Sequence, residues 1–184
     1  MNRYLLLLLL LWGWKLSMFS QTPVIQEARG WLESAYISWA PLEGVSDYVV
    51  SWSGDGKSNQ AIDPQLIRFY GDYYRADVLG LKAGTYTIKV AALVDGVAGS
   101  AAESPALEVR AHDRTGFAFA NGRVPGAYRA DGTAKEGAVV LYVTEQNKNT
   151  VSMNVTGANA NPCVGLQEIL DGFKKGKDNR PLIV

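Results

Sequence analysis

Residues 81–92 read Leu-Lys-Ala-Gly-Thr-Tyr-Thr-Ile-Lys-Val-Ala-Ala, and polar and apolar side chains alternate strongly from Thr85 onward. Because successive side chains of a β-strand point to opposite faces, this alternation predicts a strand over residues 85–93 with one buried face and one solvent face. The buried face would carry Tyr86, Ile88, Val90 and Ala92. Gly84 precedes the strand and Asp95-Gly96 follows it, and these residue types favour turns.

Similar short alternating runs, separated by turn residues, occupy the chain between residues 24 and 111. Predicted strands cover residues 36–39, 47–52, 73–78, 85–93 and 106–109. The turn at residues 53–57 contains two glycines, which readily adopt a positive φ. Strands at this spacing predict an antiparallel β-sandwich, so the expected fold class is mainly β.

The composition limits the kinds of function that are open to the chain. It has 184 residues, with 18 Lys and Arg, 18 Asp and Glu and a formal net charge of zero. This balance argues against a strongly basic binding face, so we expect no nucleic-acid partner. Cys163 is the single cysteine, which excludes an intramolecular disulfide framework and a Cys-rich zinc site.

The first 20 residues have the pattern of a secretory signal peptide. Arg3 gives a short basic start, and residues 5–11 are all leucine, which fits the roughly 7–15 apolar residues of such a segment. The leucine run is shorter than the roughly 20 apolar residues that a membrane span needs. We expect cleavage near residue 20, no stable membrane span afterwards, and a secreted, periplasmic or cell-surface protein. An uncleaved anchor is the alternative.

The pattern changes in the second half of the chain. Residues 138–144 are almost continuously apolar, which is typical of a strand buried on both faces, and a second short strand is predicted over residues 151–155. A helix is predicted over residues 165–174, with Gly176 placed to end it. Another buried strand begins at residues 181–184. The apolar stripe of the helix consists of Leu166, Ile169, Leu170 and Phe173.

An apolar strand at the end of the chain would leave an unpaired edge, and such edges promote aggregation. The helix stripe also needs a surface to pack against. We therefore expect a truncated chain, in which residues 112–184 are incomplete. A complete small α+β domain is the alternative.

Trp39 lies on an early predicted strand, Tyr48 lies on the next, and residues 81–92 lead through a later one. These residues carry a resemblance to a fibronectin type III domain over about residues 25–110. It implies that Trp39 fills the core between two sheets. It also implies that Tyr86 occupies a corner position, with its hydroxyl bonded to the backbone.

The second half, residues 112–184, contains a series of short strings in a fixed order, with the predicted helix before the last of them. They are residues 116–119, 124–128, 131–135, 139–144, 148–151 and 180–184. Their order carries a resemblance to the opening of bacterial secreted pectate lyases of polysaccharide lyase family 1. It implies a helix that caps a right-handed parallel β-helix. It further implies calcium-assisted β-elimination of polygalacturonate by the full-length protein, with pectin as the substrate.

The acidic and arginine positions of that family would lie beyond this chain. We therefore assign no catalytic, cofactor-binding or metal residue here, and we expect no cofactor in this chain although calcium is expected for the full-length family. The expected protein is a monomeric N-terminal fragment of an exported pectate lyase, inactive alone. The alternative is a non-catalytic extracellular binding or spacer module, and an adhesion protein is a third hypothesis, because fibronectin-like folds host many functions.

Several aromatic residues are candidates for contact with carbohydrate, because flat and partly polar rings can stack on sugars. They are Trp31, Trp52, Tyr70, Tyr73 and Tyr74. The alternative is that Trp52 and one of the two adjacent tyrosines belong to the core, since strand alternation sends neighbours to opposite faces.

The remaining candidates have an ordinary structural alternative. Asp113, Asp131 and Glu136 are a possible calcium site or solvated turn acids, while Arg123 and Arg129 could face an anionic polymer or solvent. His112 is interpreted as a surface or linker residue rather than a ligand, and Cys163 as an apolar core residue rather than a reactive thiol. Residues 154–156 form a glycosylation sequon. Residues 55–58 resemble the end of a P-loop, but Ser51 stands where that motif requires glycine.

Overall fold

The computed structural model describes residues 21–174, 176 and 178–184. The chain divides into two compact units, with the boundary in the sequence between Ala111 and His112. The predicted signal peptide lies outside the described residues. In the described part of the chain, no helix has the length and apolar character that crossing a membrane would require.

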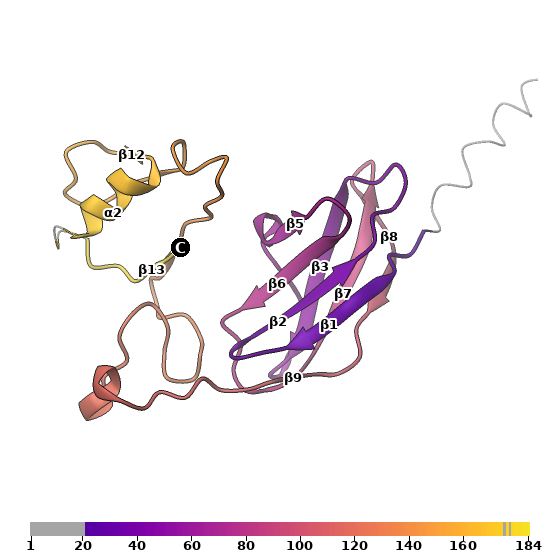
Figure 1. Ribbon diagram of the computed structural model, residues 1–184, viewed down its shortest axis with the longest axis horizontal. Coiled ribbons are helices and arrows are strands. Elements are labelled where there is room, and N and C mark those ends of the chain that lie inside the picture. Colours follow the sequence, from indigo (N-terminus) through magenta and orange to yellow (C-terminus); the bar gives the residue numbers. More distant parts are fainter. Residues whose placement is uncertain (1–20, 175, 177) are drawn as a thin grey trace, which may run out of the picture. The chain divides into compact units, whose positions relative to one another are not determined.

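Unit 1 consists of two antiparallel sheets. Figure 1 shows β1, β2 and β6 in one layer and β3, β7 and β8 in the other. The first sheet has the order β1 (Ile25–Gly30), β2 (Ser34–Trp39), β6 (Tyr74–Leu79) and β5 (Ile67–Phe69). The second has the order β4 (Lys57–Ala61), β3 (Asp47–Gly54), β7 (Gly84–Val94) and β8 (Val97–Glu103), and β9 (Leu107–Val109) also pairs with β7. The predicted antiparallel sandwich is confirmed.

The five predicted strands correspond to β2, β3, β6, β7 and β9, whereas β1, β4, β5 and β8 were not predicted. The strand β4 is polar and exposed along its whole length, so it lacks the apolar alternation by which a strand is recognised. The strand β8 is built mainly of Ala, Gly and Ser. Their pairing with β3 and β7 holds them in the sheet.

Two hairpins in the second sheet use turn residues with positive φ. Asp55 and Gly56 have φ of 52° and 72° between β3 and β4, and Asp95 and Gly96 have φ of 51° and 77° between β7 and β8. Two successive positive φ values match the twist of antiparallel strands. The P-loop-like string at residues 55–58 is therefore part of a hairpin, in agreement with its rejection.

The sandwich core is organised around Trp39, which is completely buried. Its ring meets Tyr48 edge-on, with ring centroids 5.1 Å apart, and stacks on Tyr74 at 5.8 Å. The Tyr48 hydroxyl accepts a hydrogen bond from the backbone N–H of Leu42 at 3.0 Å. The prediction that Trp39 fills the space between the sheets is confirmed.

The corner role of Tyr86 is also confirmed. Its hydroxyl donates to the carbonyl oxygen of Lys82 at 3.1 Å, while its ring is buried. Burial raises the pKa of Tyr86, because loss of solvent disfavours the phenolate. Gly54 leaves room for the ring: a Cβ at Gly54 would lie 2.3 Å from Tyr86 Cδ1.

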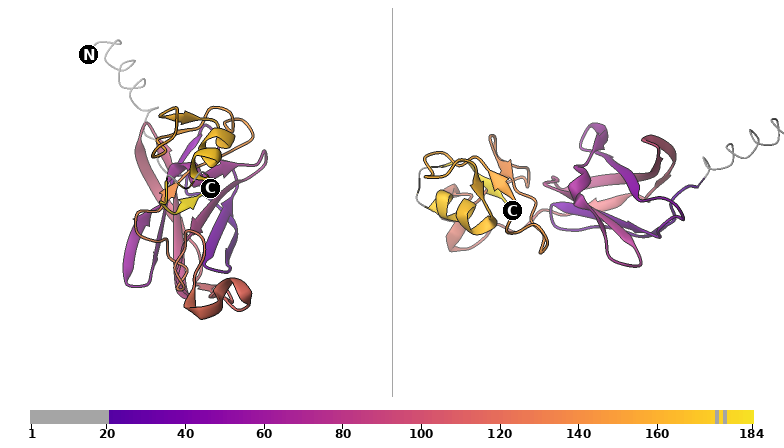
Figure 2. Two further views of the ribbon diagram at one scale, coloured as in Figure 1. Left: turned by 90° about the vertical axis from the view of Figure 1, so that its left-hand side faces the viewer. Right: turned by 90° about the horizontal axis from the view of Figure 1, so that it is seen from above.

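Unit 2 has little regular structure. Its elements are η3 (Phe117–Gly122), β10 (Val139–Val140), β11 (Ser152–Met153), β12 (Cys163–Val164), α2 (Leu166–Lys174) and β13 (Leu182–Ile183). The pair β11–β12 is antiparallel and the pair β10–β13 is parallel. Both views of Figure 2 show α2 among these short strands. The predicted helix is confirmed at almost the expected bounds.

The helix α2 covers a small second core. Leu141, Val155, Cys163 and Ile169 are buried there. In the predicted stripe, Ile169 is fully buried and Leu166 and Phe173 are partly buried, but Leu170 is 39% exposed. Among the described residues, parallel pairing of strands in unit 2 is limited to β10 and β13. A β-helix cap therefore stays a prediction.

The expectation of a doubly buried strand over residues 138–144 is wrong. Only β10 forms there, and Val140 is 45% exposed. The side chain of Asn147 occupies backbone groups that a longer strand would use for pairing with its neighbour. It accepts a hydrogen bond from Thr144 N at 2.6 Å and donates one to Tyr142 O at 3.1 Å. The run is apolar, but a polar side chain outside it directs the backbone away from the strand.

An ion pair between the buried Asp178 and the partly exposed Arg180 holds the segment that follows α2. The carboxylate of Asp178 is 2.6 Å from Arg180 Nη2 and accepts a hydrogen bond from Thr156 N at 3.0 Å. Arg180 also donates to the carbonyl oxygen of Asn154 at 2.7 Å. The hydrogen bonds from Arg180 hold the pKa of Asp178 well below its ordinary value, although burial opposes this shift.

Candidate functional site

The outer face of the first sheet has a hollow, which is lined by residues of β1, β2 and β6 and by Tyr73. In register, Glu27 of β1, Ser38 of β2, Arg75 of β6 and Arg68 of β5 form one row across the four strands. Ser38 is small and lies between larger neighbours, so the face is depressed there. The hollow has a volume of about 340 Å³ and is lined by Gln26, Glu27, Tyr36, Ser38, Tyr73 and Arg75.

Polar contacts hold one wall of the hollow in place. The Tyr36 hydroxyl donates to Glu27 Oε1 at 2.8 Å, and the guanidinium of Arg75 lies over the Tyr36 ring, 3.8 Å from its centroid. Arg75 in turn makes a two-point contact with Asp77, with its shortest N–O distance 2.7 Å. The hydrogen bond to Glu27 raises the pKa of Tyr36, with a smaller contribution from burial. These side chains are held by each other before any ligand arrives, which lowers the cost of ordering them on binding.

An aromatic platform adjoins this hollow. Tyr70 and Tyr73 flank the turn between β5 and β6, where Tyr70 N donates to Tyr73 O at 2.9 Å. Their rings are stacked, with centroids 5.2 Å apart and planes 10° apart. Tyr73 lines the hollow and Tyr70 is 51% exposed. The pair therefore offers a flat aromatic surface beside hydrogen-bonding groups.

The structure places the five aromatic candidates in different surroundings. Tyr74 packs inward against Trp39, which confirms that strand alternation places one of the adjacent tyrosines in the core. Trp52 packs on Tyr86 in the other sheet. Trp31 is 51% exposed in the loop after β1, with Arg110 near its ring. Only Tyr70 and Tyr73, among the five, come together.

Sequence reasoning missed Tyr36 and Arg75 as parts of this site. Both lie on the outward face of predicted strands, and that alternation was the available signal. Their meeting depends on the pairing of β2 with β6, in which Tyr36 faces Asp77 and Ser38 faces Arg75. Nothing local to either strand specifies that register.

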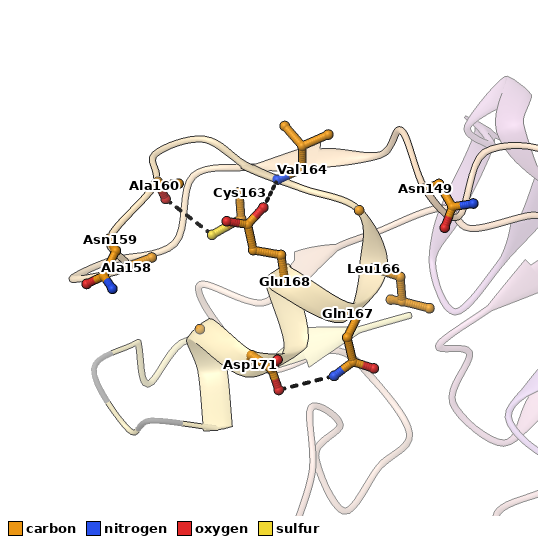
Figure 3. A pocket seen from close by; sticks show the side chains of 12 residues that line it. Asn149, Ala158, Asn159, Ala160, Cys163, Val164, Leu166, Gln167, Glu168 and Asp171 are labelled. Carbon is orange, nitrogen blue, oxygen red and sulfur yellow. Dashed lines mark hydrogen bonds between the residues drawn. The ribbon is translucent and has the colours of Figure 1, made fainter.

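Unit 2 has a second hollow, of about 460 Å³, beside the start of α2. Figure 3 shows that Cys163, Glu168, Gln167 and Asp171, which line it, already have partners within the protein. Glu168 Oε2 accepts from Val164 N at 2.9 Å, and Gln167 donates to Asp171 at 3.1 Å. Cys163 is 1% exposed and its thiol donates to Ala160 O at 3.3 Å. The interpretation of Cys163 as a core residue is confirmed.

The remaining candidates do not form a site. Asp131 accepts hydrogen bonds from the backbone and hydroxyl of Thr133, which is the behaviour of a turn acid. In the described ranges, no group of three or more His, Cys, Asp or Glu side chains could hold a metal ion, so the calcium interpretation has no support there. Exposed positions are taken by His112, Asp113, Arg123, Arg129, Glu136 and Asn154.

Neither a protein-family model nor a curated protein matches the chain. Similar solved structures include a β-1,2-glucanase from Parabacteroides distasonis, which is 26% identical with a TM-score of 0.37. That match covers 50% of this chain and 13% of the length of the glucanase.

Two further similar structures are fibronectin type III domains. The fourth such domain of a human protein is 20% identical, with 53% of this chain and 84% of that chain covered and a TM-score of 0.38. An Fn3-like protein from Clostridium thermocellum is 20% identical, with 51% and 100% covered and a TM-score of 0.34.

Unit 1 has the features of a fibronectin type III-like β-sandwich. Its two antiparallel sheets, the buried Trp39 between them and the corner hydrogen bond of Tyr86 are the observations that define this class. Because such sandwiches carry many unrelated functions, the class by itself assigns none.

Proposed function

We propose that the chain is a non-catalytic, extracellular carbohydrate-binding module whose sugar contacts are made by unit 1. The observation that carries this proposal is the stacked pair Tyr70–Tyr73 beside a hollow lined by hydroxyl, amide and carboxylate groups. The extracellular location rests on the signal-like pattern of residues 1–20.

Sugars suit this arrangement for two reasons. A pyranose ring has a flat apolar face that packs on a tyrosine ring, and its hydroxyl groups need hydrogen-bonding partners at the side. The hollow supplies Gln26, Ser38 and Glu27 as such partners. Its volume lies near the lower end of the roughly 300–1,000 Å³ of small-molecule sites, and it is open along the sheet face, as a polymer would require.

The test is calorimetric titration of the full chain with cellohexaose, xylohexaose and a hyaluronan hexasaccharide. We expect binding of at least one of them, and a loss of about tenfold in affinity on Tyr73→Ala because one stacking face is removed. The matched control is Phe117→Ala, which removes an almost fully exposed aromatic ring of unit 2. Absence of binding by all three sugars, or an equal effect of both substitutions, would contradict the proposal.

A second candidate is the N-terminal part of an exported pectate lyase. It is supported by the order of the sequence strings in residues 112–184 and by α2 followed by a strand in parallel pairing. A coding sequence that continues past Val184 into repeated short apolar strands and Asp-rich turns would favour it. Calcium-dependent release of unsaturated products from polygalacturonate by the 184-residue chain alone would contradict both candidates, because each expects no catalytic group here.

A further inference from the structure

Glu27, Ser38, Arg75 and Arg68 form a row across the first sheet, and its charges indicate which kind of sugar would bind. This inference rests on the proposed function. We propose that the site selects acidic sugars, with the guanidinium of Arg68 as the contact for their carboxylate or sulfate group. The observation is the direct cross-strand pairing of Arg68 with Arg75 on the outer face. Like charges placed directly opposite each other destabilise a strand pair.

The two arginines differ in how their charge is balanced. Arg75 is held by Asp77 through two N–O contacts and stacks on Tyr36. In contrast, none of the described residues forms an ion pair or a side-chain hydrogen bond with Arg68, although Arg68 is only half-exposed. An anion beside Arg68 would supply the missing partner and reduce the repulsion from Arg75.

The position of Arg68 fits a sugar acid better than a free anion. Tyr73 lines the same hollow as Arg75, and Tyr70, which stacks on Tyr73, comes directly after β5 and two residues after Arg68. An acidic sugar stacked on the tyrosine pair would therefore have its charged group near Arg68. A planar carboxylate or a sulfate can accept two hydrogen bonds from one guanidinium.

Glu27, at the β1 end of the row, indicates the orientation of the ligand. Glu27 lies three strands away from Arg68, roughly 14 Å at ordinary strand spacing, and its carboxylate would repel a second acidic group. Ser38 lies between them, and its hydroxyl has no hydrogen-bond partner among the described residues. The site thus favours an acidic group at the β5 edge and neutral hydroxyl groups toward β1.

The experiment compares matched pairs of sugars on the full chain. One pair is the hyaluronan hexasaccharide, which carries carboxylates, and its methyl ester. The other is dextran sulfate of low mass and unsulfated dextran. We expect the acidic member of at least one pair to bind about tenfold more tightly than its neutral counterpart, and the pair that shows this identifies the acidic group.

Arg68→Gln is expected to abolish that preference while leaving the affinity for the neutral member unchanged. Arg68→Lys keeps the charge but loses the two-point contact, and is expected to retain part of the preference. The matched control is Arg123→Gln, which removes one charge from an exposed loop of unit 2 and should have no effect. The fold of each variant is checked by tryptophan fluorescence, to which the buried Trp39 contributes.

The outcomes separate the inference from the proposed function. Equal binding of acidic and neutral members, both weakened by Tyr73→Ala, would overturn the inference and leave the carbohydrate-binding function standing. Failure of every sugar to bind would overturn both. Binding of a poly-glutamate peptide as tightly as the acidic sugars, without any effect of Tyr73→Ala, would also overturn the inference, because it would indicate a site for acidic peptides.

Discussion

Tyr86 and Gly54 show how single residues determine the corner of the sandwich. The Tyr86 ring needs the space that a side chain at position 54 would fill, and Gly54 has φ of 152°, a backbone conformation that other residues rarely adopt. From this position the Tyr86 hydroxyl donates to the carbonyl oxygen of Lys82 at 3.1 Å. The tyrosine was predictable from the strand pattern, whereas the need for Gly54 appears only when β3 and β7 are paired.

Gly54→Ala is expected to destabilise unit 1 by about 2–4 kcal/mol, because backbone strain and a clash with the Tyr86 ring add. The measurement is urea unfolding followed by Trp fluorescence. The matched control is Gly56→Ala, also at positive φ but with open space around it, for which we expect a loss of about 1 kcal/mol. Equal losses in the two variants would show that the clash contributes nothing.

The helix α2 shows what can be predicted of a whole element. Its 3.6-residue apolar period and the glycine after it were sufficient to place it, because both signals are local. Its packing was not predictable: Gly172 lies against Val155, a residue that belongs to no regular element. The strand β4 was also not predictable, because its polar segment forms a strand only through its pairing with β3.

Gly172→Ala tests the packing of α2 against Val155. Two effects on the stability of unit 2 oppose each other in this variant. Alanine favours an isolated helix by about 1 kcal/mol, but its Cβ would lie 2.7 Å from Val155 Cγ1. Val155 is fully buried and its side chain is stiff, so we expect overpacking to dominate and unit 2 to lose about 1–2 kcal/mol. The readout is the urea dependence of Cys163 labelling.

Val155→Ala would make room for the added methyl group. In a double-mutant cycle, the second substitution should therefore cost less in the Gly172→Ala background than in the wild type. A variant Gly172→Ala that is more stable than the wild type would contradict the close contact between α2 and residue 155.

The whole molecule carries separate probes for its two units. All tryptophans lie at or before residue 52, so in the described residues Trp31, Trp39 and Trp52 report on unit 1. The buried Cys163 reports on unit 2. In unit 2, the hydrogen bonds from Arg180 lower the pKa of Asp178 in the folded chain.

Acid is therefore expected to weaken unit 2 before unit 1. A folded-state pKa below the unfolded value means that Asp178 contributes stability above its ordinary pKa of 3.8, and that this contribution falls as the pH decreases below about 5. Labelling of Cys163 by a pyridyl disulfide should accelerate below that pH while the Trp fluorescence stays unchanged.

Asp178→Asn should remove this pH dependence and destabilise unit 2 by about 1–3 kcal/mol at neutral pH, because Arg180 and Thr156 lose the charged acceptor of their hydrogen bonds. The matched control is Asp171→Asn, in an exposed pair with Gln167. Labelling that responds to acid equally in the wild type and in Asp178→Asn would refute the role of this carboxylate.

The amino-acid sequence by itself was enough for several local features of this protein. The two-residue period of β7 indicated which face is buried, Asp95-Gly96 indicated a turn, and the stripe of α2 indicated a helix, because each depends only on near neighbours in the chain. The tertiary structure alone decided the register that aligns Glu27, Ser38, Arg75 and Arg68 on one face. That alignment depends on pairing between strands distant in sequence, and such pairing is set by how the faces of the two sheets pack rather than by any strand alone.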